Sequence, residues 1–140
     1  MSQKLIEYFN KQPRLGCLST ANKEGKADVA ILGSPQMVDE KTVVMSLRNN
    51  RTFANLQENP YAVFAIMEPG KTAPEWKGLR VYLKMTKYET SGELLHMFKA
   101  QLAKKVSEAV AKLAYAAVTF DVYEVRPIID AGQGWENSIA

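Results

Sequence analysis

Cysteine is nearly absent from this sequence. Cys17 is the only one, so no disulfide can form within the chain. A free thiol suits a reducing compartment, and we expect a cytoplasmic protein. No apolar run approaches the roughly 18 residues that a membrane span needs. The first residues lack the apolar stretch and cleavage site of a signal peptide. Neither secretion nor a membrane partner is therefore expected.

Histidine is equally scarce, and the usual clusters of catalytic or metal-binding side chains are missing. His96 is the only histidine, and no second histidine or cysteine lies near it, so we predict no metal site. His96 lies off the apolar stripe of its segment and is expected to be exposed. Cys17 alternates with apolar neighbours and is expected to be buried. No Ser/His/Asp or Cys/His arrangement can be recognised from spacing, so catalytic residues stay unassigned.

Charge of one sign is also limited. The formal net charge is +3, and the lysines are spread along the chain. A nucleic-acid-binding protein would show a denser basic stripe interleaved with aromatic residues, so no nucleic-acid partner is expected. The one local cluster, formed by Lys99, Lys104 and Lys105, is typical of a solvated helix face.

The residues that are present fit one domain over positions 1–140, with 46% hydrophobic and 24% charged residues. Apolar runs bounded by turn residues predict strands, and apolar side chains at three- and four-residue spacing predict helices. The predicted strands span residues 14–21, 27–32, 42–47, 61–67, 79–86 and 116–125, and the predicted helices span residues 2–10, 52–58 and 91–113.

The order of these elements favours a mainly β or α+β fold. The connections between strands are too short for repeated βαβ crossovers, and a Gly-rich phosphate turn is missing, which argues against a Rossmann-type sheet. We expect an antiparallel barrel or sandwich, with a short helix after the third strand and a long helix before the last strand. A closed barrel would also remove exposed sheet edges.

Residues 46–56 carry the clearest chemical signal. A buried strand ends in a loop with Arg48 and Arg51, and a helix then begins near Thr52, the predicted N-cap. The free N–H groups and partial positive charge of a helix N-terminus attract anions. Together with an arginine and the threonine hydroxyl, they suit a phosphate dianion. The same residues also fit an ordinary solvated loop, and the pattern alone does not decide between the two.

A longer pattern surrounds this segment. A strand of small and hydroxyl residues (GCLST, residues 16–20), a polar glycine turn and strands at 27–32 and 43–46 lead into the motif R-T-x-x-N-L-x-x-N-P at 51–60. These features resemble the pyridoxamine 5′-phosphate oxidase-related superfamily of FMN-binding split barrels, and within it the small FMN-binding and flavoredoxin-like proteins. The resemblance implies an antiparallel split β-barrel with FMN as its cofactor.

The resemblance also implies a set of binding residues. In this superfamily, the loop after the third strand and the start of the short helix hold the FMN phosphate, and nearby strands pass along the flavin ring. The implied phosphate contacts are Arg51, Thr52 and Arg48. The implied further contacts are Ser46 and Leu47 through backbone groups, Asn49 and Asn55 as secondary contacts, and Ala30 and Ile31 from the second strand.

Members of the superfamily are typically homodimers with the flavin in a groove between subunits, and a homodimer is expected here. Residues from the later strands or the tail of one subunit often cover the flavin of the other, so Trp76 or Trp135 is expected near the ring. The chain lacks the extended Arg-rich C-terminal segment of true pyridoxamine 5′-phosphate oxidases. This difference argues against oxidation of vitamin B6.

The expected function is an FMN-dependent oxidoreductase or electron-transfer protein with an unknown small-molecule donor and acceptor. The missing acid–base cluster agrees with this expectation, since a flavin carries its own redox chemistry. One alternative is a flavin carrier or sensor that binds FMN without turnover. Another is the same fold with deazaflavin F420 or heme as its ligand.

Overall fold

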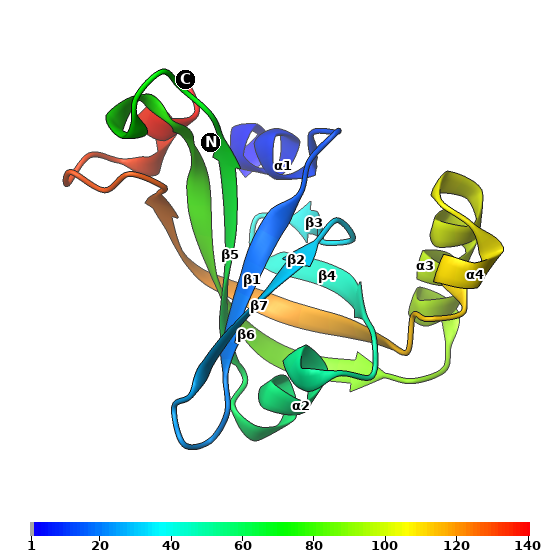
Figure 1. Ribbon diagram of the computed structural model, residues 1–140. Helices are drawn as coiled ribbons and strands as arrows, with labels where there is room; N and C mark the ends of the chain where they lie inside the picture. The colour runs from blue at the N-terminus through cyan, green and yellow to red at the C-terminus, as the bar shows by residue number, and fades with distance from the viewer. Residues whose placement is uncertain (1) are drawn as a thin grey trace.

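Within residues 2–140, which the computed structural model describes, one antiparallel sheet of seven strands has the order β2-β1-β5-β6-β7-β4-β3 (Figure 1). The strands are β1 (Gly16–Ala21), β2 (Ala27–Leu32), β3 (Gln36–Asp39), β4 (Thr42–Leu47), β5 (Tyr61–Glu68), β6 (Lys77–Glu89) and β7 (Ala116–Pro127). The sheet curls into a split β-barrel, and the predicted fold class is confirmed.

The two longest strands, β6 and β7, bend the sheet. Their pairing shifts register next to Tyr82 and again next to Met85, and such bulges increase the bend and twist of a strand. The first part of β6 pairs with β5, whereas the first part of β7 pairs with β4. The sheet therefore wraps around a core to which both of its halves contribute.

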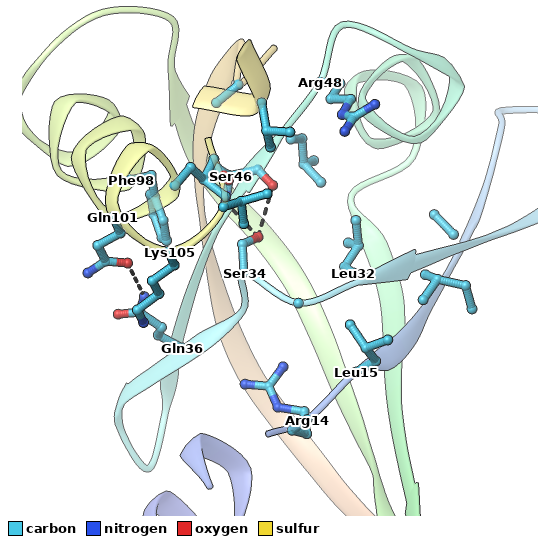
Figure 2. Close-up of a pocket in the computed structure, with 18 of the residues that line it drawn as sticks. Arg14, Leu15, Leu32, Ser34, Gln36, Ser46, Arg48, Phe98, Gln101 and Lys105 are labelled. Carbon is cyan, nitrogen blue, oxygen red and sulfur yellow. Dashed lines mark hydrogen bonds between the residues drawn. The ribbon is translucent and has the colours of Figure 1, made fainter. Parts of the chain in front are cut away.

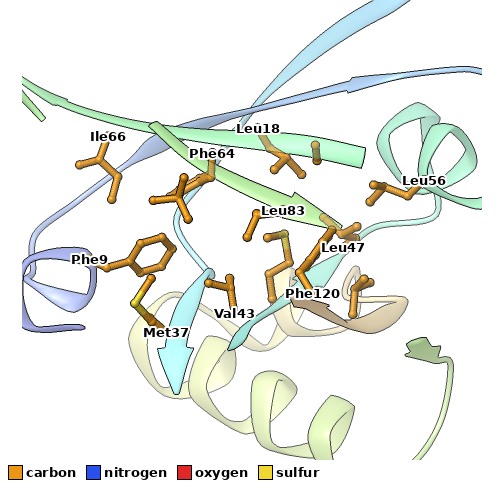
Figure 3. Close-up of a cluster of buried hydrophobic side chains, with 14 of the residues drawn as sticks. Phe9, Leu18, Met37, Val43, Leu47, Leu56, Phe64, Ile66, Leu83 and Phe120 are labelled. Atoms are coloured by element: carbon orange, nitrogen blue, oxygen red, sulfur yellow. The ribbon is translucent and has the colours of Figure 1, made fainter. Parts of the chain in front are cut away.

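Alternate side chains of the strands point into this core, as the period of two in a strand requires. Leu18, Val43, Phe64, Leu83 and Phe120 come from five different strands, and each is 0% exposed. Figure 3 shows these side chains facing one another across the barrel. The core thus ties β4, which carries the predicted binding segment, to the rest of the sheet.

Helices and 3₁₀ turns close the ends of the barrel and cover its side. They are α1 (Ser2–Asn10), α2 (Arg51–Glu58), η1 (Ala73–Glu75), α3 (Glu93–Lys105), α4 (Glu108–Ala111) and η2 (Trp135–Ser138). Phe9 of α1 packs against Phe64 with ring centroids 5.5 Å apart. The Asn10 side chain exchanges two hydrogen bonds of 2.8 Å with the backbone of Met37 in β3. None of the helices in this described part is long and apolar enough to cross a membrane.

The long helix predicted at residues 91–113 is wrong, because the chain breaks into α3 and α4. Ser107 precedes α4, and its Oγ accepts a hydrogen bond from the N–H of Val110 at 3.1 Å. Such a cap starts a new helix. The apolar stripe that suggested one helix is buried at Phe98, which is 1% exposed, but not along its whole length, since Val106 and Leu113 are 63% and 48% exposed.

Two other expectations are corrected by the strands. Residues 36–39 form the short strand β3, which the sequence pattern missed because only Met37 of this segment is buried. The short helix α2 therefore follows the fourth strand. In β1 the inward side chains include Leu18 and Thr20, so Cys17 lies on the outer face and is only half-buried.

Gly16 lies where β1 approaches the core ring of Phe64. A Cβ at this position would collide with that ring and would lie 2.8 Å from the carbonyl oxygen of Ala65. We expect Gly16→Ala to lower the free energy of unfolding by about 1–3 kcal/mol, because overpacking forces the ring and the strand apart. Chemical denaturation measures the loss. Gly33→Ala is the control, because its nearest atom is the flexible Leu15 Cδ2 at 3.3 Å. Equal losses in the two variants would contradict this account.

Candidate functional site

A pocket of about 720 Å³ opens between the end of β2, the β2–β3 connection, the end of β4 and the α3–α4 pair (Figure 2). Its volume falls in the ~300–1,000 Å³ range of small-molecule sites. The lining side chains come from residues within 12–15, 30–36, 46–52 and 98–114. The fold therefore brings four distant segments of the chain to one cavity.

The end of β4 and the start of α2 form one side of this pocket. Asn50 precedes the helix in an extended conformation, makes no side-chain capping bond, and accepts the N–H of Ala54 at 3.0 Å. The N–H groups of the first turn therefore have no acceptor within the helix. The predicted N-cap at Thr52 is wrong, because the helix begins at Arg51. Thr52 is instead 3% exposed and lines the pocket.

The β2–β3 connection is fastened to β4 by one serine. The Oγ of Ser34 donates to the carbonyl oxygen of Ser46 at 3.1 Å and accepts the N–H of Ser46 at 3.2 Å (Figure 2). The backbone of Ser46 is thereby held in place, and its N–H already has an acceptor. This pair of bonds joins the β2–β3 connection to β4 where both line the pocket.

Helices α3 and α4 supply the opposite wall, which is mostly apolar. Phe98 and Val106 line it, and the Gln36 side chain reaches from β3 to donate to Gln101 at 2.8 Å. Lys105 closes the edge of this wall. It is exposed, as its sequence environment predicts, but it also borders the pocket.

Arg14 lies at the end of the pocket away from Arg48 (Figure 2). Its Nη2 donates to the carbonyl oxygen of Pro35 at 2.6 Å. The guanidinium lies over the rings of Phe9 and Phe64, 5.1 and 5.4 Å from their centroids. Its Nε and Nη1 are buried without a hydrogen-bond acceptor. Burial lowers the pKa of this guanidinium, and the charge is held here without a counterion.

The charged residues that line the pocket are all cationic: Arg14, Arg48 and Lys105. Among residues 2–140, none of the three forms an ion pair, and no aspartate or glutamate lines the pocket. Three cations without a neutralising carboxylate create a positive potential inside a cleft. The chemistry of the pocket therefore favours an anionic ligand.

The structure brings most of the predicted binding residues together. The predicted residues that line the pocket are Ala30, Ile31, Ser46, Leu47, Arg48 and Thr52. Asn49 and Arg51 are exposed beside it without lining it. The Asn55 side chain instead lies in the interior, where it donates to the Thr20 Oγ1 at 3.1 Å and ties α2 to β1.

The two tryptophans lie outside this pocket in their own chain. Trp76 follows η1 and is 36% exposed. Trp135 starts η2 and lines a separate, more open hollow of about 330 Å³ together with Leu5 and Val122. Their predicted place near a flavin ring depends on a second copy of the chain and stays a prediction.

Sequence reasoning missed Arg14, Ser34, Gln36 and Gln101. Arg14 precedes a strand, and the other three are ordinary polar residues of a connection, a short strand and a helix. Their shared place around one cavity follows from the packing of α3 against β4 and from the hydrogen bond between Ser34 and Ser46. No local spacing in the sequence signals either contact.

Comparisons with known proteins show the family and the fold of this chain. The family model described as pyridoxamine 5′-phosphate oxidase matches residues 2–128. No curated protein matches the sequence.

Several solved structures share the fold. An FMN-binding protein from Syntrophomonas wolfei subsp. wolfei is similar with a TM-score of 0.74 and 20% identity, over 91% of this chain and 88% of that one. The heme storage protein HutZ from Vibrio cholerae has a TM-score of 0.65 and 19% identity, over 88% and 92% of the two chains. A structure described as an F420 reductase has a TM-score of 0.66 and 14% identity, over 85% and 94%. These similarities show that the chain shares its fold with proteins whose names refer to different ligands, namely FMN, heme and F420.

The clasp between Ser34 and Ser46 can be tested directly. We expect Ser34→Ala to lower the free energy of unfolding by about 1–2 kcal/mol, because the N–H of Ser46 loses its acceptor. The amide of Ser46 should also exchange faster with solvent, which hydrogen-exchange NMR measures. Ser19→Ala, on the exposed face of β1, is the control. Unchanged exchange at Ser46 in the Ser34 variant would show that the clasp does not hold this wall.

Proposed function

The chain belongs to the pyridoxamine 5′-phosphate oxidase family, and on this basis we propose that it is an FMN-binding flavoprotein that serves as an oxidoreductase or electron-transfer protein for a small molecule. The observation that carries the proposal is the end of the pocket that is lined by Arg48 and by the buried Thr52, a residue of the first turn of α2. Free N–H groups, a hydroxyl and a guanidinium are the donors that a phosphate dianion takes.

The proposed phosphate end fits the FMN tail in chemistry. Charge-assisted hydrogen bonds are worth about 1.5–3 kcal/mol each, so two or three of them anchor a phosphorylated cofactor. Arg48 is exposed at the mouth, beside the start of α2 (Figure 2). Arg51, which directly precedes Thr52, is also exposed and supplies further positive charge. The N-terminal dipole of α2 adds to the same field.

The rest of the pocket fits a flat, largely apolar ring. Ala30, Ile31 and Leu32 line it from β2, and Leu47 lines it from β4. A flavin ring placed against these side chains would bury apolar surface on both sides of the contact, which is favourable. When bound, FMN supplies hydride and electron transfer, whereas the protein binds and orients it. Among residues 2–140, no aspartate, glutamate, histidine, cysteine or tyrosine lines the pocket to move a proton.

A heme ligand is less well supported. Heme iron is held by His, Cys, Met or Tyr side chains, and the pocket is lined by none of these within the described chain. His96 lies on α3 outside the lining, and its predicted exposure is confirmed. Deazaflavin F420 remains the alternative occupant, because the same cationic end would hold its phosphate.

A homodimer is part of the proposal, because β2, β5 and the residue before β1 expose several large apolar side chains. Leu15, Val29 and Ile31 are 67%, 61% and 63% exposed, and Tyr61 and Met67 of β5 are 51% and 42% exposed. Exposed apolar patches of this kind mark interfaces. Ile31 and Leu15 also line the pocket, so a second copy on this face would border the flavin. Its Trp76 or Trp135 is our candidate for a cover over the ring.

The proposed compartment is the cytoplasm. The single cysteine supports this proposal, because a chain that forms no internal disulfide suits a reducing environment.

Removal of the proposed phosphate contacts should release FMN. We expect the double variant Arg48→Gln with Thr52→Val to weaken FMN binding at least about tenfold, which corresponds to roughly 1.4 kcal/mol. The loss follows from the charge-assisted bond and the buried hydroxyl that disappear. Titration of the apoprotein, followed by flavin fluorescence, measures the dissociation constant. The single variant Arg51→Gln, titrated in the same way, measures how much Arg51 contributes to the affinity for FMN.

Lys104→Gln is the matched control for charge, because Lys104 is exposed and does not line the pocket. It should leave the FMN dissociation constant unchanged. A wild-type protein that binds no FMN would overturn the proposed function. Equal affinity in the wild type and the double variant would overturn this placement of the phosphate. Turnover of the FMN-loaded protein with NADH or NADPH then separates an oxidoreductase from a carrier or sensor.

The dimer has its own test in Val29→Asp, which puts a charge on the exposed face of β2 without touching the pocket lining. Sedimentation of the wild type should give twice the chain mass of 15.6 kDa, and the variant should sediment as a monomer, because a charge cannot be buried unpaired at an interface. Leu113→Asp, at an exposed apolar residue on another part of the surface, should stay dimeric. A monomeric wild type would refute the dimer.

A further inference from the structure

The wall formed by α3 and α4 presents apolar surface with one cation at its edge. Phe98, Leu102 and Val110 line it, and Val106, at the corner between the two helices, lines it while 63% exposed. The side-chain oxygen of Gln101 accepts a hydrogen bond from Gln36 at 2.8 Å, and the amide carries no net charge. A molecule that lies against this wall therefore meets apolar side chains first.

Lys105 differs from its neighbour Lys104 in its place relative to the pocket. Lys105 is the last residue of α3 and lines the pocket, whereas Lys104 does not. Both side chains are exposed, and neither forms an ion pair among residues 2–140. The chain thus places one free ammonium group at the pocket and an equivalent one outside it.

The positive charge of the pocket exceeds what one phosphate at the β4–α2 end requires. Arg48 lies beside that end, whereas Lys105 lies at α3 and Arg14 at the far end (Figure 2). Arg14 holds buried Nε and Nη1 atoms without acceptors. A partly buried cation without a counterion is unfavourable, and its field acts over a longer range where the dielectric constant is low. A second negative charge in the pocket would offset the field of Arg14 and pair with the free ammonium group of Lys105.

We propose that the α3–α4 side of the pocket binds a second small molecule with an apolar or aromatic body and one carboxylate, which Lys105 holds in the field of Arg14. This inference rests on the proposed function in one respect: the molecule lies beside the FMN and is its redox partner. Substrates of the protein are therefore carboxylic acids of modest size rather than neutral compounds or a second phosphorylated ligand.

The wall itself favours a carboxylate over a second phosphate. A phosphate dianion is held by several N–H donors at once, such as those at the start of α2. The α3–α4 wall ends at the C-terminus of α3, where the last carbonyl groups carry partial negative charge. One lysine in this setting balances a single negative charge and not two.

The experiment uses sodium benzoate as the probe and benzamide as its neutral counterpart of the same shape. Each is added, at constant ionic strength, to ¹⁵N-labelled protein with and without saturating FMN. We expect saturable shifts of the amide signals of Phe98, Gln101 and Val106 with benzoate, and at least about tenfold weaker binding of benzamide. FMN should stay bound throughout, which its absorbance reports.

Two matched variants assign the charge. Lys105→Gln should weaken benzoate binding about tenfold, and Lys104→Gln should leave it unchanged, because only Lys105 lines the pocket. The two variants are matched, since each removes one positive charge from the same helix. Arg14→Gln should weaken benzoate binding as well, by lowering the field in the pocket. Neither lysine variant should alter the unfolding transition, since both side chains are exposed.

The outcomes separate this inference from the proposed function. Saturable FMN binding combined with equal affinities for benzoate and benzamide, or with equal effects of the two lysine variants, would overturn the carboxylate site alone. Benzoate that displaces FMN would overturn the second site beside the flavin. Absence of FMN binding, with benzoate still selective for Lys105, would overturn the proposed function and leave the anion site standing.

Discussion

The ladder between β4 and β7 is the constraint on which the pocket depends. Ser46 pairs with Ala117 and Leu47 with Ala116, and the two alanines are 1% and 0% exposed. The N–H of Tyr115 donates to the carbonyl oxygen of Leu47 at 2.8 Å, which ties the start of β7 to the end of β4. Because β7 also pairs with β6 across the barrel, the end of β4 is part of the core. The loop of polar residues that follows β4 therefore starts from a strand end whose position is fixed by the core.

This arrangement separates the scaffold from the binding chemistry. Val43 and Leu47 are buried, whereas Arg48 and Asn50 are exposed within a few residues of them. A rigid strand end therefore presents polar groups on a short loop to a cavity whose other wall, α3–α4, belongs to a different packing cluster. Changes in the loop or in that wall can alter the ligand while the barrel stays the same, which is the usual relation between a fold and its sites.

The parts of the fold that could be predicted from sequence are those with a local cause. β4 was predicted with its observed bounds, because a β-branched run between polar turns is typical of a buried strand. β3 has four residues with one buried side chain and offers too little pattern. The break at Ser107 was missed, because apolar spacing continues through it and the cap is a single hydroxyl.

The candidate site divides in the same way. The segment around Thr52 could be predicted, because a helix start with cations and a hydroxyl is a local signal. The roles of Arg14 and Lys105 could not be predicted, because each depends on which distant segment lies opposite. For Arg14 that opposite surface is the pair of rings from Phe9 and Phe64, which α1 and β5 bring together. Only the folded chain places these cations around one cavity.

We propose that the turn from β4 into α2 holds a phosphate group of a flavin nucleotide. A crystal structure of the protein grown with FMN tests it most directly. We predict that the phosphate oxygens lie within hydrogen-bond distance of the Thr52 hydroxyl and of the N–H groups that open α2. A phosphate bound away from this turn, or FMN bound on another surface of the barrel, would contradict the account.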